Sequence, residues 1–175
     1  MMSKKLSSQG TAILALIVLV MIWGYNWVVM KIAVQYAAPF DYAALRVLLG
    51  GLCLLLVLVW RRQPIRPKRV GGTVLVGTLQ MSAFYGLSTW ALVSGGAGKT
   101  AVLNYAMPFW VLLLAWLVLG EQVRGVQWIS VVVALVGLIC ILMPLSLAEG
   151  LFSKELAILS SISWAGGVIV AKKLQ

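Results

Sequence analysis

Apolar residues fill this chain in long runs that are separated by short polar or Gly/Pro-rich breaks. Six runs stand out, at about 11–34, 40–60, 70–93, 98–119, 124–144 and 154–172. A helix needs about 20 apolar residues to cross the hydrocarbon core of a bilayer, at about 1.5 Å per residue. The runs lack the period of two that a barrel strand requires. The pattern therefore predicts an all-α fold, a polytopic membrane helix bundle.

Composition agrees with this prediction. Hydrophobic residues make up 62% of the chain, charged residues make up 10%, and the mean hydropathy is +1.03. A soluble domain carries about 25% charged residues, so this chain could not cover a core with a polar surface. Because the breaks are short, helices that are neighbours in sequence are expected to pack as antiparallel neighbours.

The net charge of +10 is divided unevenly between the two ends of the expected helices. Six crossings place the N-terminal tail, the loops 61–69 and 120–125, and the C-terminal end on one side, which carries ten Lys or Arg residues. The loops of the other side carry only Lys99 and Lys154. The positive-inside rule then predicts a cytoplasmic N-terminus. The basic run at 61–69 is interpreted as a membrane anchor, and no nucleic-acid partner is expected.

The sequence offers little for catalysis. It contains no histidine, no serine paired with a base and no cluster of metal ligands. SGGAGKT (94–100) ends like a phosphate-binding loop, but Val93 stands where that motif needs a glycine. Cys53 and Cys140 lie within apolar runs and are expected to be small core residues. We therefore expect no enzyme activity, no catalytic residue, no cofactor and no bound metal.

One short sequence pattern, called the repeated phrase below, occurs twice in the chain. MIWGYNWVVMK (21–31) and ISWAGGVIVAK (162–172) each place a lysine eight residues after a tryptophan, and the copies are 141 positions apart. Because the copies are five crossings apart, the second copy must enter the membrane from the opposite side. This arrangement indicates an inverted repeat, in which two halves are related by a pseudo-two-fold axis and enclose a substrate site.

Several stretches resemble a known family. PFDYAALRVLLGGL (39–52) is similar to the second helix of the drug/metabolite transporter superfamily, in its EamA-type branch. Residues 104–142 resemble the fourth and fifth helices of that branch, with Pro108, Gly120-Glu121 and Gly137 in place. WGYNWVVMK and ELAILSSISWAGGVIVAKK support the resemblance, which covers essentially the whole chain.

The resemblance implies a ten-helix protein built from two repeats of five helices. Residues 1–148 would form the first repeat, and residues 149–175 the truncated start of the second. The expected partners are the lipid bilayer, a small-molecule substrate and the remaining half of the same protein. The implied function is secondary transport by alternating access, exporting neutral or aromatic amino acids or similar metabolites across the bacterial inner (plasma) membrane, with YddG-like exporters most similar. Two alternatives are a nucleotide-sugar or sugar-phosphate exchanger on the same fold and a non-transporting membrane scaffold subunit.

Helical spacing places polar and aromatic side chains on one face of four of the expected helices. The candidate substrate-binding residues are Trp23, Asn26, Met30, Thr78, Ser82, Tyr85, Ser88, Asn104, Met107 and Trp164. The alternative interpretation is that these side chains make hydrogen bonds and packing contacts between helices. Pro108 removes a backbone hydrogen bond within the fourth expected helix, and is the candidate hinge.

Two basic residues, Lys31 and Arg46, fall within the apolar runs. Lys31 is expected either to extend its amine to the membrane surface or to bind a phosphorylated solute. Arg46 is expected either to anchor helices together or to attract a carboxylate. Glu121 and Arg124 are expected to pair across a turn. No Asp or Glu lies at the centre of a run, which argues against proton-coupled exchange of cationic drugs.

Overall fold

The computed structural model describes residues 8–64, 69–122, 125–142 and 150–174, and all regular structure within them is helical. The elements are α1 (Ser8–Ala33), α2 (Pro39–Trp60), α3 (Val70–Gly77), the π-helix η1 (Thr78–Ala83), α4 (Phe84–Ser94), α5 (Ala97–Asn104), α6 (Met107–Leu119), α7 (Gln127–Leu142) and α8 (Leu151–Leu174). α3, η1 and α4 follow one another without a break and form one long helical segment. The predicted all-helical fold is confirmed for the described residues.

Five segments of the described chain are helical, long and apolar enough to cross a membrane. They are Gln9–Ala33, Pro39–Trp60, Val70–Ser94, Ala97–Leu119 and Leu151–Leu174. Each corresponds to one of the apolar runs in the sequence. The remaining run, expected at 124–144, contains α7, and three of its residues at the two ends lie outside the described residues.

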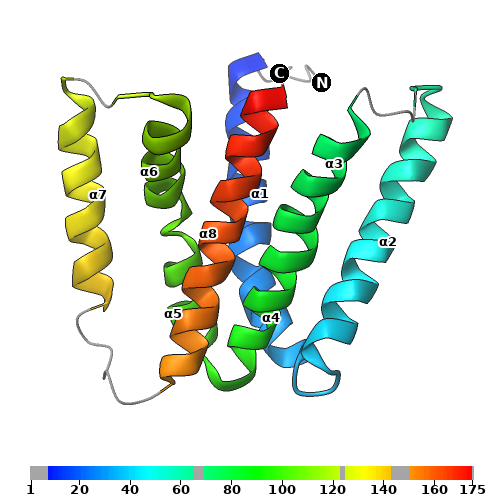
Figure 1. Cartoon of the computed structure of the whole chain (residues 1–175). Helices are drawn as coiled ribbons and strands as arrows, with labels where there is room; N and C mark the ends of the chain where they lie inside the picture. The colour runs from blue at the N-terminus through cyan, green and yellow to red at the C-terminus, as the bar shows by residue number, and fades with distance from the viewer. Residues whose placement is uncertain (1–7, 65–68, 123–124, 143–149, 175) are drawn as a thin grey trace, which may run out of the picture.

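Successive membrane segments run in alternating directions (Figure 1). α1 begins at the top of that view and descends, whereas α8 begins at the bottom and ascends. The two copies of the repeated phrase therefore lie on oppositely directed helices. The end of α2, the start of α3 and the end of α8 share the top, which is the side where the sequence concentrates basic residues. Of those residues, Lys4, Lys5, Arg66, Lys68 and Arg124 lie outside the described residues.

α8 is the central helix of the bundle. It packs against α3, η1, α4, α5 and α6, and it stands among them in Figure 1. Its buried positions are mostly small, and Ala157, Ser160 and Ala165 are fully buried. Small residues allow membrane helices to approach closely. At Gly167 the approach is so close that the Gln80 side chain of η1 occupies the place where a Cβ would be.

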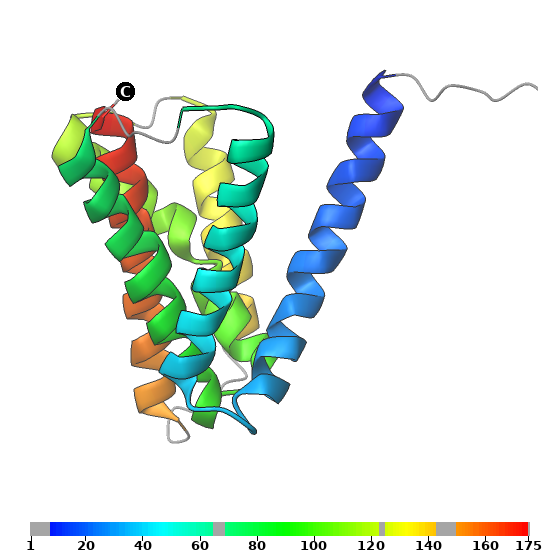
Figure 2. The same cartoon turned by 90° about the vertical axis from the view of Figure 1, so that its right-hand side faces the viewer.

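α1 is attached to the bundle by its second half. Trp27 and Met30 form a buried apolar cluster with Leu92 of α4, against which Tyr42 of α2 also packs, and the main contacts of α1 are with α4 and α5. The first half of α1 stands apart from the other helices in Figure 2, and its apolar side chains are exposed. Trp23, nearer the middle of α1, is 54% exposed.

Polar groups from two other helices hold the C-terminal end of α4. Lys31 Nζ donates hydrogen bonds to the carbonyl oxygens of Leu92 and Val93, at 2.6 and 3.2 Å. The Ser153 hydroxyl of α8 donates to the Ala91 carbonyl oxygen at 2.6 Å. A helix leaves its last carbonyls without internal partners, so Lys31 satisfies the Leu92 and Val93 carbonyls, while Ser153 adds a second bond to the Ala91 carbonyl, which also accepts one from the Gly95 N–H. Lys31 is thus a cap on α4, a role that neither expectation from the sequence included.

Two further expectations need correction or restriction. Cys53 and Cys140 are exposed rather than core residues. Glu121 pairs with Lys172 of α8, with the Lys172 Nζ 2.5 Å from a Glu121 carboxylate oxygen. Arg124, the expected partner of Glu121, lies outside the described residues.

Candidate functional site

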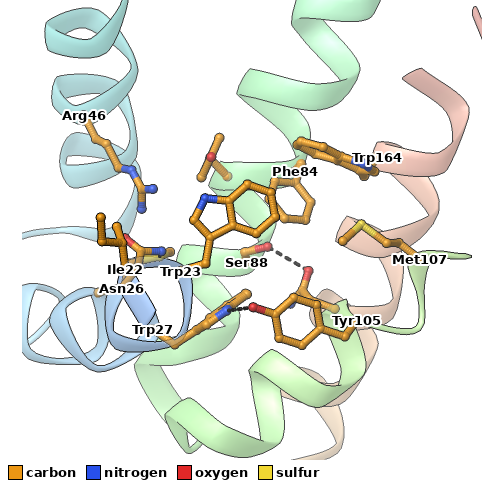
Figure 3. Close-up of a pocket in the computed structure, with 13 residues that line it drawn as sticks. Ile22, Trp23, Asn26, Trp27, Arg46, Phe84, Ser88, Tyr105, Met107 and Trp164 are labelled. Carbon is orange, nitrogen blue, oxygen red and sulfur yellow. Dashed lines mark hydrogen bonds between the residues drawn. The ribbon is translucent and has the colours of Figure 1, made fainter. Parts of the chain in front are cut away.

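A cavity of about 420 Å³ lies between the helices that carry the two copies of the repeated phrase (Figure 3). Its size suits a small organic molecule. Side chains from α1, α2, α4, α5, α6 and α8, with one from the short link between α5 and α6, form its walls. The lining residues are Ile22, Trp23, Asn26, Trp27, Met30, Arg46, Phe84, Tyr85, Ser88, Asn104, Tyr105, Met107 and Trp164.

Aromatic rings make up much of the wall and hold one another in place. Trp164 packs edge-on against Phe84, with ring centroids 4.8 Å apart. On the other side, Trp27 packs edge-on against Tyr105 at 6.3 Å, and its indole N–H donates a hydrogen bond to the Tyr105 hydroxyl at 3.3 Å (Figure 3). Edge-to-face pairs of this kind are favourable beyond the area they bury. The cavity therefore presents ordered aromatic surface from four different parts of the chain.

Asn104 is the hub of a buried polar network at the base of the cavity. Its Oδ1 accepts a hydrogen bond from Ser88 of α4 at 3.0 Å and one from Ser160 of α8 at 2.5 Å. Its Nδ2 donates to the Thr100 carbonyl oxygen at 3.0 Å. Asn104 is only 1% exposed. The network ties three helices together, which is the packing role that the sequence left open as an alternative for this residue.

Two polar side chains of the cavity have hydrogen-bonding capacity left over. The Asn26 amide donates to the sulfur of Met30 at 3.3 Å, which is a weak acceptor. The Arg46 guanidinium lies over the Tyr85 ring, with its central carbon 4.6 Å from the ring centroid. Arg46 Nη1 is buried and has no hydrogen-bond partner within the described part of the chain. Arg46 is also the single charged residue among those that line the cavity.

A break in the fourth expected helix helps to form the cavity. The sequence predicts one helix over 98–119, whereas α5 ends at Asn104 and α6 begins at Met107. Pro108 lies in the first turn of α6, where its missing N–H would have no helical partner in any case. The break at Tyr105 and Ala106 turns both Tyr105 and Met107 toward the cavity. The kink expected at Pro108 is therefore a full interruption of the helix.

The structure brings eight of the ten candidate residues to this cavity. They are Trp23, Asn26, Met30, Tyr85, Ser88, Asn104, Met107 and Trp164. Thr78 and Ser82 do not line it, and both are exposed. They belong to η1, where the hydrogen bonds widen from i→i+4 to i→i+5, as in the bond from the Phe84 N–H to the Leu79 carbonyl. The wider turn breaks the 3.6-residue register that placed them in line with Tyr85.

Five lining residues are absent from the candidate set. They are Ile22, Trp27, Arg46, Phe84 and Tyr105. Helical spacing does place Trp27 on the same face as Trp23, although Trp27 is not among the candidates. Phe84 and Tyr105 reach the cavity because of the π-turn and the helix break, which helical spacing does not reveal.

A model of the EamA-like transporter family matches residues 10–143 of this chain. The chain belongs to the EamA-like transporter family. The family assignment from the quoted stretches is thereby confirmed. Together with the five apolar helices of sufficient length, it makes this a multi-pass membrane protein of a transporter family.

Similar proteins carry transporter names. The chain is 33% identical to the Bacillus subtilis "uncharacterized transporter YvbV", over 97% of this chain and 56% of that protein. It is 29% identical to "uncharacterized transporter YoaV" of the same organism, over 93% of this chain and 57% of that protein. It is 28% identical to the Escherichia coli "uncharacterized inner membrane transporter YedA", over 91% and 53%. The chain thus spans little more than half the length of these relatives. No solved structure matches it.

Proposed function

We propose that this chain forms part of a secondary transporter that exports amino acids with apolar or aromatic side chains, or similar small metabolites. The observation that carries the proposal is the aromatic cavity of about 420 Å³ at the meeting point of oppositely directed helices. Its walls supply apolar surface, two amides and one guanidinium, which suits a small solute with an apolar body and a polar end. The names of its relatives, which call them transporters, support the general activity.

The proposed architecture is a ten-helix protein in which α1 and α8 begin two inverted repeats of five helices. Two findings support it. Trp23 and Trp164, the equivalent tryptophans of the repeated phrase, both line the cavity. The relatives are nearly twice as long as this chain, which leaves room for four more helices. Assignment to the YddG-like branch belongs to the same proposal.

The proposed mechanism is alternating access, in which one repeat rocks against the other around the cavity. The interruption between α5 and α6 is the proposed hinge, since Tyr105 and Ala106 separate two helical pieces and Pro108 prevents their fusion. Met107 lies beside that interruption and on the cavity wall, so a change in the angle between α5 and α6 would reshape the site.

The proposed location is the inner membrane, with the N-terminus in the cytoplasm. The excess of Lys and Arg on the side of the N-terminal tail supports this orientation. YedA, a relative, is named as an inner membrane transporter.

A sugar-phosphate or nucleotide-sugar exchanger is less well supported. A phosphate dianion needs more than one fixed cation. Arg46 is the one charged side chain on the described cavity wall, and Lys31 is engaged by the α4 carbonyls.

Flux measurements with the intact protein in proteoliposomes test the proposal. We expect counterflow of radiolabelled phenylalanine, leucine or tryptophan, saturable and inhibited by the unlabelled amino acid. If transport occurs only in exchange for a phosphorylated solute, the sugar-phosphate or nucleotide-sugar exchanger would be the better interpretation. Absence of flux for every solute, in protein that is folded and correctly inserted, would favour the non-transporting scaffold.

A further inference from the structure

Arg46 is a charged residue placed where charge is costly. It lies seven residues after the start of α2 at Pro39, which is about 10 Å along the helix. α2 is otherwise apolar over most of its length, and its exposed side chains include Leu45, Leu48 and Leu49. A guanidinium stays positively charged in proteins, so it must find a partner or remain solvated.

We infer that Arg46 binds the carboxylate of the transported solute, and that the site selects small monocarboxylates with an apolar or aromatic body, whether or not they carry an amino group. This inference rests on the proposed transport function and concerns the same cavity. It specifies the chemical group that the site recognises.

The geometry leaves the hydrogen-bonding edge of Arg46 available. One face of the guanidinium is covered by the Tyr85 ring, at 4.6 Å from the ring centroid. Its Nη1 is shielded from solvent and makes no hydrogen bond to any described residue. Figure 3 shows the side chain pointing from α2 into the cavity, toward Asn26 and Trp23. Tyr85 thus orients the group while its N–H donors remain free for a ligand.

The described acidic residues do not neutralise Arg46. Asp41 lies in the first turn of α2 and is exposed. Glu155 is exposed on α8, and Glu121 forms the one ion pair found within the described ranges, with Lys172. Removing a charge from water without a counter-ion costs several kcal/mol. An anionic ligand would therefore gain the attraction that the protein itself does not satisfy.

A single guanidinium fits a carboxylate better than a phosphate. Its planar fork can bond both oxygens of a carboxylate and balance its single charge. A phosphate monoester carries up to two charges, and the cavity wall offers no second cation among the described residues. The rings of Trp23, Phe84 and Trp164 provide the surface for an apolar body.

The cavity does not require an ammonium group on the solute. None of its lining residues is acidic. Aromatic faces attract cations only modestly where the cation stays hydrated. An amino acid and the corresponding 2-oxo acid should therefore bind with similar affinity, whereas the corresponding amine should bind poorly.

Four ligands with one phenyl group test this inference by calorimetry on the intact protein in nanodiscs. They are phenylalanine, phenylpyruvate, phenethylamine and phenyl phosphate. We expect the two carboxylates to bind within a few-fold of each other, and the amine about 10- to 100-fold more weakly, which is the range for loss of a charged hydrogen bond. Equal or tighter binding of the amine overturns the inference, as does tightest binding of phenyl phosphate or no binding of either carboxylate.

Substitutions identify the residue. Arg46→Gln should weaken the carboxylates by the same factor without weakening the amine, because it removes a like charge from beside the ammonium, and Arg46→Lys should fall between. Arg61→Gln is the matched control, since it removes an arginine charge at the exposed end of the same helix. Unchanged carboxylate affinity in Arg46→Gln overturns the inference. If this variant does not fold, the ligand comparison on the unaltered protein still decides.

Binding and flux separate the two proposals. Carboxylate-selective binding through Arg46 without any flux would support this inference and contradict the transport proposal. Transport of solutes that lack a carboxylate, with the same affinity as the carboxylates, would support transport and contradict this inference.

Discussion

Trp23 and Trp164 line the same cavity from two helices that run in opposite directions. They are 141 residues apart in sequence, and each stands eight residues before a lysine. The two lysines act at opposite ends of the bundle, with Lys31 on the end of α4 and Lys172 on Glu121. The repeated phrase thus contributes a ring to the cavity and a polar contact at a helix end in both of its copies.

Replacement of either tryptophan should impair solute binding. Trp164→Ala removes a ring that packs against Phe84, and Trp23→Ala removes a ring from the facing helix. We expect each to raise the KM for transport by up to about tenfold, because an aromatic contact with the bound solute contributes about 0.5–1.5 kcal/mol. Proteoliposome flux measures the change. Trp116→Ala is the control, since Trp116 is 54% exposed, as is Trp23, but lies outside the cavity. A loss in the control as large as in the cavity variants would refute the assignment.

The Ser160 hydroxyl should stabilise the bundle through Asn104. Ser160→Ala removes a hydrogen bond from α8 to α5, and hydrogen bonds between membrane helices average about 0.6 kcal/mol. We expect the free energy of unfolding to fall by about 0.5–1.5 kcal/mol in a denaturation titration in micelles. Ser161→Ala is the control, because the Ser161 hydroxyl donates to the Ile158 carbonyl within its own helix. Equal losses in the two variants would show that the contact between helices contributes nothing.

Lys31 should matter for stability rather than for solute choice. Lys31→Met leaves the Leu92 and Val93 carbonyls without their donor. We expect a loss of about 1–2 kcal/mol in unfolding free energy, and rescue by Lys31→Arg. Lys99→Met removes an exposed lysine near the same end of the bundle, and should leave stability unchanged. If Lys31→Met changed which solutes are preferred but left the stability unchanged, Lys31 would instead belong to the solute-binding site.

Two adjacent glycines should respond differently to an added methyl group. A Cβ at Gly95 would lie 2.6 Å from the Ala91 carbonyl oxygen and would also collide with the Ser153 hydroxyl. Backbone cannot move aside easily, so Gly95→Ala should cost about 1–3 kcal/mol. A Cβ at Gly96 meets nothing within 4 Å. Thermal unfolding in detergent should show a lower Tm for Gly95→Ala alone, and similar Tm values for both variants would contradict the close packing of α8 against α4.

The membrane segments could be predicted from the sequence because each apolar run has the length of a bilayer crossing. The parity of the crossings then fixed the opposite directions of α1 and α8. The candidate residues on α1 all line the cavity, because α1 is a regular helix and residues spaced by 3.6 positions share one face.

The rest of the site depends on departures from regular helix. η1 is stabilised from outside, where Ser163 of α8 donates to the Leu79 carbonyl and Gln80 packs on Gly167. These partners are more than 80 residues away in sequence. No local sequence pattern therefore predicts the π-turn that keeps Thr78 and Ser82 out of the cavity. Arg46 was recognised as unusual, but its position in the cavity depends on how α2 packs against α4, which spacing within α2 does not specify.

The central claim is that the cavity between α1 and α8 is where the solute binds, and cysteine protection tests it most directly. Met107→Cys is placed in a protein whose exposed Cys53 and Cys140 are changed to alanine, and its reaction with a small maleimide is timed with and without solute. Lys99→Cys, exposed and outside the cavity, is the control. The account predicts that a transported solute slows labelling at position 107 in proportion to its occupancy and leaves position 99 unaffected. Unchanged labelling at position 107 under a saturating concentration of a transported solute would contradict it.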